Sequence, residues 1–148
     1  MLGKKYLPWA LMCLPFSIAA QEPAEPVADG NDTVTVAVQK HLVRSAFTRG
    51  IQNNEPIDIL LSLSNQYDKV YYFTELQGME GQVITHRWEY EGQQMADVSF
   101  SVGGPRWRVW SSKYLLPQWT GEWKVRVLDS QGNELGSDVL QYTPAAQP

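Results

Sequence analysis

The chain has 148 residues, a formal net charge of -4 and a single cysteine, Cys13. One cysteine excludes an internal disulfide, and the acidic balance argues against nucleic acids and anionic membranes as partners. Because Cys13 lies in an N-terminal stretch that we expect to be removed, thiolate catalysis and soft-metal ligation are excluded for the remaining chain as well.

Residues 1–20 have the layout of a secretory signal peptide. Lys4 and Lys5 give a positive start, an apolar stretch follows, and Ala19 and Ala20 supply the small residues of a cleavage site. The apolar stretch is shorter than the roughly 20 residues that a spanning helix needs. We therefore expect a periplasmic or secreted protein with no transmembrane segment after signal removal.

Residues 21–32 (QEPAEPVADGND) contain four acids, two prolines and only one residue, Val27, that could anchor a core. This composition predicts a disordered acidic linker. The last residues, 144–148, have a similar character and predict a flexible tail. We expect the folded domain to span residues 33–143.

Strand patterns fill this domain, because apolar residues recur at every second position between clusters of Gly, Asn, Asp and Pro. Residues 57–63 form a short apolar run of uncertain type, and Leu115 and Leu116 are expected to plug the core. We predict an all-β fold, an immunoglobulin-like antiparallel two-sheet sandwich of seven to eight strands. The strand patterns fall at residues 33–38, 43–48, 69–76, 83–90, 96–102, 106–112, 119–129 and 135–142.

The hairpin around Gly92 can be tested for register, because a slip of one residue would exchange the buried and solvated faces. A two-residue turn would set the apolar residues of the second strand beside Arg87 and Glu89. A three-residue loop, 90–92, with Gly92 at positive φ avoids this burial of charge. The predicted register then pairs His86 with Ala96 and Ile84 with Val98.

Three segments resemble an uncharacterised bacterial family, catalogued as domain of unknown function 2914. They are THRWEY, WRVWSSK and GEWKVRVLD, beginning at Thr85, Trp107 and Gly121. The resemblance extends over about residues 43–142. It implies an envelope setting, because related chains carry the domain after a signal peptide or at the C-terminal end of membrane proteins. It implies no activity and no catalytic residue.

The residues themselves offer little for catalysis. The two histidines, His41 and His86, are separated in sequence from Ser111 and Ser112, and no nucleophile elbow is present. We interpret His86 as a packed, hydrogen-bonded residue, with a proton-transfer role as the alternative. We expect no enzyme, although a carboxylate pair such as Glu75 with Glu89 or Asp97 is left open as the basis of a small hydrolase.

Metal and cofactor sites are not expected either. Two separated histidines without cysteine cannot form a structural zinc site. The segment 129–134 lacks the alternating ligands of a calcium loop and is interpreted as a hairpin turn. We predict neither a metal nor a cofactor.

The most informative segment begins at Arg106, because strand alternation separates its side chains into two faces. Burial of Trp107 and Val109 would leave Trp110 between two arginines on the opposite face. Such a surface could bind sugar rings, peptides or carboxylates, or it could be an internal stack of arginine on tryptophan. The candidate binding residues are Arg106, Arg108, Trp110, Ser112, Lys113 and Trp119.

We therefore expect an exported, non-catalytic binding module of the cell envelope. An envelope protein is the favoured partner, and addition of a strand to an open sheet edge is one mode of binding. A carbohydrate- or murein-binding module is the alternative of the same class, and a carboxylate-based hydrolase is the alternative from another class. The oligomeric state is left open.

Overall fold

A computed structural model describes residues 41–147 of the chain. This part of the chain contains strands and no helix. The all-β class predicted from the alternating patterns is therefore confirmed. The strands are β1 (Leu42–Thr48), β2 (Ile51–Gln52), β3 (Glu55–Pro56), β4 (Ser62–Ser64), β5 (Lys69–Gln77), β6 (Val83–Tyr90), β7 (Gln93–Ser101), β8 (Arg106–Tyr114), β9 (Gly121–Leu128) and β10 (Glu134–Thr143).

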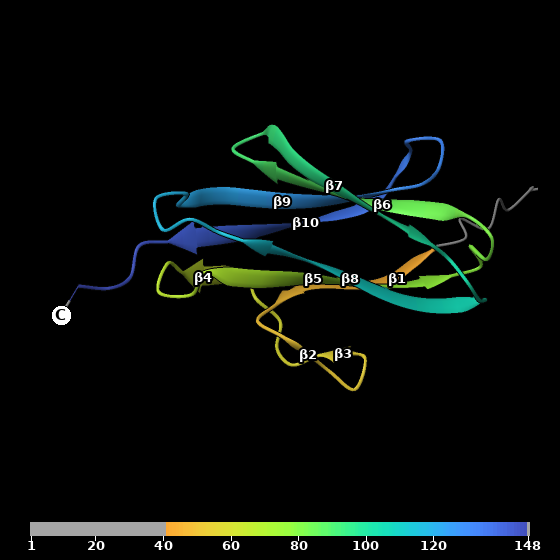
Figure 1. Cartoon of the computed structure of the whole chain (residues 1–148), viewed down its shortest axis with the longest axis horizontal. Helices are drawn as coiled ribbons and strands as arrows, with labels where there is room; N and C mark the ends of the chain where they lie inside the picture. The colour runs from red at the N-terminus through yellow and green to blue at the C-terminus, as the bar shows by residue number, and fades with distance from the viewer. Residues whose placement is uncertain (1–40, 148) are drawn as a thin grey trace, which may run out of the picture. The chain divides into compact units, whose positions relative to one another are not determined.

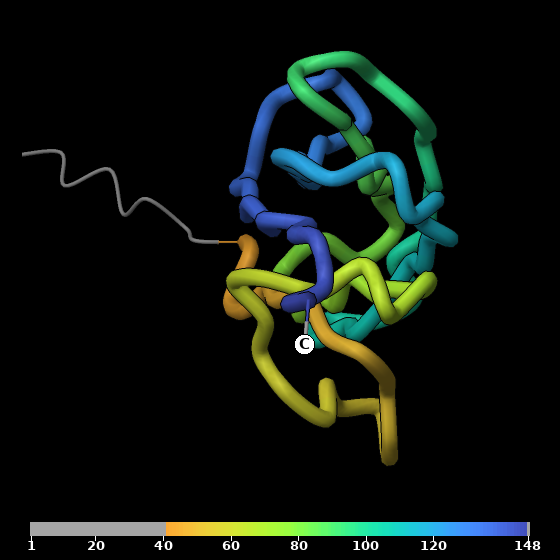
Figure 2. Tube along the Cα trace, turned by 90° about the vertical axis from the view of Figure 1, so that its left-hand side faces the viewer, coloured from red at the N-terminus to blue at the C-terminus, as the bar shows by residue number. Residues whose placement is uncertain are grey.

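These ten strands form three sheets. A three-stranded sheet has the order β1-β5-β8, a five-stranded sheet has the order β4-β10-β9-β6-β7, and β2 and β3 form a small hairpin. The hairpin projects from the three-stranded sheet in both views (Figures 1 and 2). The short strands β2, β3 and β4 account for the excess over the seven or eight strands expected. The pairing of β4 with β10 is parallel, so the five-stranded sheet is mixed instead of purely antiparallel.

The core lies between the three-stranded and the five-stranded sheets. Alternate residues of β5, including Tyr72 and Leu76, point inward from the first sheet. The alternate residues that the sequence assigned to the inner face of β9 are fully buried, as are those at the end of β10. The Tyr72 ring packs edge-on against Trp88 of β6, and such aromatic contacts add to the burial of apolar area. The buried residues from β6, β9 and β10 are Ile84, Trp88, Trp123, Val125, Val127, Leu140 and Tyr142.

The predicted three-residue loop between β6 and β7 is wrong. The loop has two residues, Glu91 and Gly92, both at positive φ, as a type I′ turn requires. Tyr90 therefore faces Gln93, the arrangement that was expected to bury charge. Instead, a bulge between Trp88 and Glu89 shifts the pairing by one residue, so that the apolar residues of β7 lie beside those of β6. The register that results pairs Trp88 with Ala96, His86 with Val98 and Ile84 with Phe100.

One expectation about a loop is also corrected, and the run of uncertain type can now be placed. Leu115 is buried as predicted, but Leu116 is exposed, because only the first of two adjacent side chains points inward as the chain crosses from β8 to β9. The run 57–63 contributes Leu63 to the core through β4, and Leu60 packs partly buried against it. The remaining large residues of the run, Ile57, Ile59 and Leu61, are exposed. The predicted signal peptide, the acidic linker and the whole predicted strand 33–38 lie outside the described residues.

Two glycines at positive φ give a matched test of backbone strain. Gly92 has open space where an added methyl group would stand, whereas a methyl at Gly121 would collide with the Glu91 carboxylate, which accepts the Glu122 N–H at 2.5 Å. We expect Gly92→Ala to lower the free energy of unfolding by about 1 kcal/mol and Gly121→Ala by about 2 to 3 kcal/mol. Urea unfolding of both variants measures the difference, and equal losses would show that the Glu91 contact is unimportant.

Candidate functional site

The outward surface of the three-stranded sheet carries an ion-pair cluster beside aromatic rings. We call this surface the arginine face and define it by Arg44 of β1, Phe73 and Glu75 of β5, and Arg106, Arg108 and Trp110 of β8. Cross-strand pairing brings these residues together, since Glu75 lies opposite both Arg44 and Arg108, and Phe73 lies opposite Trp110. The neighbours of Glu75 are thus fixed by strand register.

Glu75 is the centre of the arginine face. Its side chain has no exposed area, yet it pairs with Arg44, Arg106 and Arg108. The Arg44 Nε and Nη2 atoms lie 2.8 and 2.5 Å from Glu75 Oε2, and Arg108 Nε lies 3.4 Å from the same oxygen. Burial acts to raise the pKa of Glu75, but the hydrogen bonds from Arg44 and Arg106 outweigh it and hold the pKa below its ordinary value. The buried carboxyl is therefore ionised at neutral pH.

The β2–β3 hairpin is tied to this cluster by a second carboxylate. Glu55 of β3 pairs with Arg44 at 3.0 Å and with Arg108 Nη1 at 2.9 Å. The hairpin and the segment after it cover the β1 side of the sheet, where Ala46 and Phe73 are buried although they point outward. The β8 side is left open.

Trp110 lies on this open side, with 36% of its area exposed. The sequence left open which face of β8 is buried, and the structure places Val109 and Ser111 on the buried, inner side. Trp107, on the same side, keeps an exposed fraction of 36% at the sheet edge. Among the described residues, no guanidinium lies over the Trp110 ring, because the arginines turn toward Glu75 and Glu55 instead.

A surface hollow of about 490 Å³ joins these groups. Asn54, at the tip of the β2–β3 hairpin, lines one part of it. The rest of the lining comes from four side chains of β8, namely Arg106, Trp107, Arg108 and Trp110. The hollow is thus lined by two tryptophan rings, two guanidinium groups and an amide. These groups can bind an anionic or flat ligand.

The remaining candidates from the sequence are dispersed. Ser112 continues the outward face of β8, beyond Trp110. Lys113 points to the other side, where its Nζ lies 5.9 Å from the centre of the Trp123 ring. Trp119 follows β8 and packs against Tyr90 and Trp123, away from the arginine face. The structure therefore brings together Arg106, Arg108, Trp110 and Ser112, and it separates Lys113 and Trp119 from them.

Sequence reasoning missed three members of the cluster, namely Arg44, Glu55 and Glu75. Glu75 occupies an outward position in a strand whose other residues are mostly aromatic or β-branched, and two arginines alternate in β8. These signals indicate charge on both strands, but the pairing of β5 with β8 and of β1 with β5 is needed to show that the charges meet.

A second polar cluster lies inside the core. His86 Nδ1 lies 2.9 Å from Ser111 Oγ, and its Nε2 lies 3.0 Å from Thr74 Oγ1. Trp88 Nε1 donates to the same Ser111 Oγ at 3.0 Å. Burial lowers the pKa of His86 to about 3, so the ring is neutral at physiological pH. This agrees with the interpretation of His86 as a packed residue, because the ring is fully buried and both of its nitrogens have hydrogen-bond partners.

The carboxylates considered for hydrolysis do not meet. Glu75 lies on the outward surface of the three-stranded sheet, whereas Glu89 and Asp97 lie on the outward surface of the five-stranded sheet. Glu89 lies 3.5 Å from Arg126, and Asp97 pairs with Arg87 at 2.9 Å. Residues 41–147 contain no group of three or more His, Cys, Asp or Glu side chains arranged to hold a metal ion.

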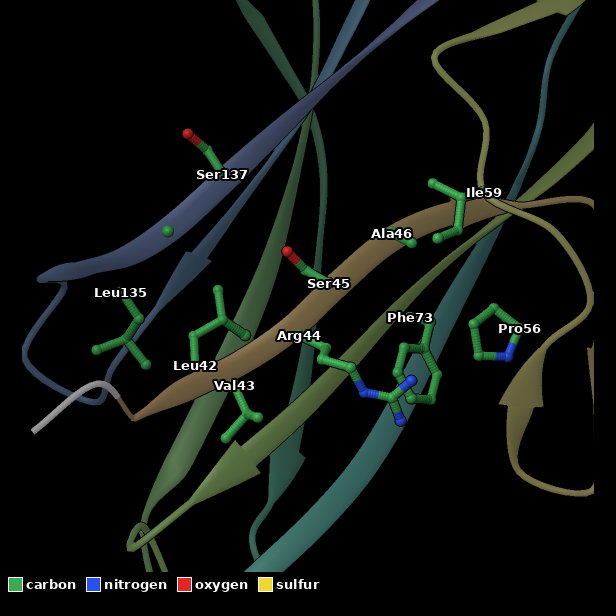
Figure 3. A pocket seen from close by; sticks show the side chains of 11 residues that line it. Leu42, Val43, Arg44, Ser45, Ala46, Pro56, Ile59, Phe73, Leu135 and Ser137 are labelled. Atoms are coloured by element: carbon green, nitrogen blue, oxygen red, sulfur yellow. The ribbon is translucent and has the colours of Figure 1, made fainter.

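Another hollow, of about 450 Å³, runs along β1 (Figure 3). Leu135 and Ser137 of β10 line one side, and Pro56 and Ile59 line the other. Its lining is mainly apolar, with Leu42, Val43 and Phe73 among the contacts. Arg44 is the one cationic residue in the lining of this hollow, and the arginines of β8 do not contribute to it.

These features define an all-β domain with a cationic and aromatic surface on one sheet. Residues 81–138 match a family described as "Protein of unknown function (DUF2914)". The family resemblance inferred from the sequence is thereby confirmed for this region, which is shorter than the span of 43–142 expected and contains all three motif segments. No curated protein matches the chain. In the described residues, no helix is long and apolar enough to cross a membrane.

Two of the motif segments meet in the core. THRWEY supplies His86 and Trp88 from β6, and WRVWSSK supplies Ser111 from β8, which bonds to both. The same WRVWSSK segment supplies Arg108 and Trp110 to the arginine face. One short strand therefore joins the buried polar cluster to the exposed site.

The charge of Glu75 is expected to support the fold. Glu75→Gln keeps the size of the side chain but leaves three arginines without their shared anion. We expect the free energy of unfolding to fall by about 1 to 3 kcal/mol, since the arginines are partly solvated. Glu55→Gln, whose side chain is 40% exposed, is the matched control and should change it by less than about 1 kcal/mol. Equal effects in urea unfolding would contradict a special role for Glu75.

His86 should make stability depend on pH. The unfolded chain binds a proton near pH 6.5, whereas folded His86 does so only near pH 3. Between these values the unfolded state holds more protons, so stability falls as pH falls, by up to about 1.4 kcal/mol per pH unit. Comparing unfolding at pH 7 and pH 5 in the wild type and in His86→Gln isolates this effect from the carboxylates. An unchanged pH dependence in the variant would refute it.

Proposed function

We propose that this protein is a non-catalytic binding module of the bacterial cell envelope that holds its ligand on the arginine face. The observation that supports the proposal is the grouping of Arg106, Arg108 and Trp110 around one hollow, fixed from below by buried Glu75. Side chains held in place before binding lose less conformational entropy when the ligand arrives. The arrangement suits recognition, because its charged groups are already positioned.

An envelope protein is favoured over a glycan as the partner. A sugar-binding surface typically offers its aromatic ring without obstruction, whereas Trp110 stands beside two guanidinium groups in the same hollow. Guanidinium groups pair readily with the carboxylates of a protein segment. Export by cleavage of residues 1–20 and a periplasmic or secreted location are part of the same proposal, supported by the pattern of the N-terminal sequence.

We further propose that the two larger sheets form an immunoglobulin-like sandwich. The support is that both sheets contribute inward side chains to a shared core and that most pairings are antiparallel. In this view, β4 and the β2–β3 hairpin are additions to the sandwich. The hairpin then serves the site directly, by placing Asn54 and Glu55 over the three-stranded sheet.

Co-sedimentation tests the binding role. The purified protein is mixed with protease-stripped murein sacculi and, separately, with intact envelope membranes. We expect retention on the membranes that protease treatment of the membranes abolishes, and we expect Trp110→Ala to reduce retention at least tenfold. The arginine comparison uses Arg108→Ala against Arg126→Ala, which has a similarly exposed arginine on the other sheet.

Each alternative has its own outcome in this experiment. Retention on stripped sacculi that Trp110→Ala abolishes would establish the murein-binding alternative. Retention that Trp110→Ala and Arg108→Ala leave unchanged would overturn the arginine face as the site. Thermal unfolding of each variant accompanies the assay, so that a loss of retention is attributed to the surface only when the protein is folded.

A further inference from the structure

Strand β8 ends the three-stranded sheet, and no strand within residues 41–147 pairs with its outer backbone edge. The Pro105 carbonyl accepts the Gly78 N–H, and the Leu115 N–H donates to Asp68, so the odd-numbered positions along β8 direct their backbone groups toward β5. In an antiparallel pair, the intervening residues direct theirs away. The N–H and C=O groups of Arg108, Trp110 and Ser112 therefore point outward, and no described residue outside the strands bonds to them.

The same even-numbered residues carry the side chains of the arginine face. One set of residues thus supplies both the backbone groups that could bond to an added strand and the side chains that could select it. A strand added beside β8 would have its alternate side chains next to Arg106, Arg108 and Trp110, on the outward surface. A free edge of this kind is a template for pairing with another segment.

The cluster also keeps unused cationic capacity. Three arginines and two glutamates leave one excess positive charge on a chain whose net charge is -4. Arg106 contacts Glu75 through Nε alone, and 64% of its side chain is exposed. Its two terminal nitrogens meet no carboxylate among the described residues, so they can form a bidentate pair with an added one.

We propose that the β8 edge binds an extended, acidic peptide segment of a partner protein, and this inference rests on the arginine face being the binding site. The segment adds as a strand to β8 and places an aspartate or glutamate beside Arg106 and Arg108. The next residue on the same face packs against Trp110. The hollow between β8 and Asn54 receives these side chains.

The opposite edge of β8 already shows this recognition within the molecule. On that side β5 places Glu75 opposite Arg108 and Phe73 opposite Trp110. An acid followed two residues away by an aromatic ring is therefore the side-chain pattern that β8 accepts from its internal neighbour. The proposed partner repeats the pattern on the free edge, where Arg106 has donors to spare.

A second copy of this chain is a poor occupant of the same edge. Strand β8 contains no acidic residue, so antiparallel pairing of two β8 strands would offer Arg106 and Arg108 no carboxylate, and in some registers it would set these arginines opposite each other. Like charges across an edge disfavour such pairing, and charged residues are a known protection of edges against self-association. The charge selects for an acidic partner.

The test uses synthetic peptides with the purified protein. The probe is a nine-residue peptide in which threonines alternate with glutamate and tyrosine, and its control replaces each glutamate by glutamine. Peptide titrations are followed by NMR of the backbone amides. We expect shifts concentrated at residues 108, 110 and 112, and at least tenfold weaker binding of the glutamine peptide. Equal binding of the two peptides would overturn the role of the acid.

Strand addition is tested separately from charge. Ser112→Pro removes an outward N–H that β5 does not use, whereas Ser112→Ala keeps this N–H and removes only the hydroxyl group. We expect the proline variant to bind at least tenfold more weakly than the alanine variant. Should Ser112→Pro fail to fold, the wild-type protein with a probe N-methylated at alternate residues gives the same test. Undiminished binding of the N-methylated probe would overturn the edge mode.

Two further outcomes separate this inference from the proposed function. A peptide copying residues 21–32 has four acids but two prolines, so it controls for charge alone, and binding as tight as that of the probe would overturn strand addition. Membrane retention that depends on Trp110 while no acidic peptide binds would overturn the inference and leave the proposed function standing. Loss of both would remove the site itself.

Discussion

The three-stranded sheet depends on a buried carboxylate shared by three arginines from two neighbouring strands. Glu75 is placed at the middle strand, so Arg44 reaches it from β1 and Arg106 and Arg108 reach it from β8. A fully buried, ionised carboxylate would be costly without these partners. Because the arginines are drawn to the carboxylate, they cannot lie over Trp110, and its ring stays available at the open side of the sheet.

The two faces of strand β8 contribute differently to the molecule. The inward residues of β8 join the core, where Ser111 accepts from Trp88 and contacts His86, while its outward residues form the exposed site. A strand fastened on one side by buried hydrogen bonds keeps its other side chains in register. This explains how an edge strand, which is ordinarily the least constrained part of a sheet, can present a fixed set of guanidinium and aromatic groups.

Much of this could be predicted from sequence, and the missing parts have identifiable causes. Alternation correctly predicted the buried faces of β6, β9 and the end of β10, since those strands carry apolar residues at every second position. It also placed Arg106, Arg108 and Trp110 on one surface. The hairpin register was missed, because a bulge near Trp88 and a change in loop length compensate each other. Glu75 was missed as a partner, because long-range pairing decides which charges meet.

The shared carboxylate also bears on how such a sequence can change over time. Removing one arginine leaves Glu75 with two others, so the arginines are partly redundant. Replacing Glu75 itself by an apolar residue leaves three positive charges side by side. To remove this repulsion, several arginines would have to be substituted together with Glu75. Substitutions should therefore accumulate at the individual arginines while Glu75 is retained. The two sides of the same ion-pair cluster should thus change at different rates.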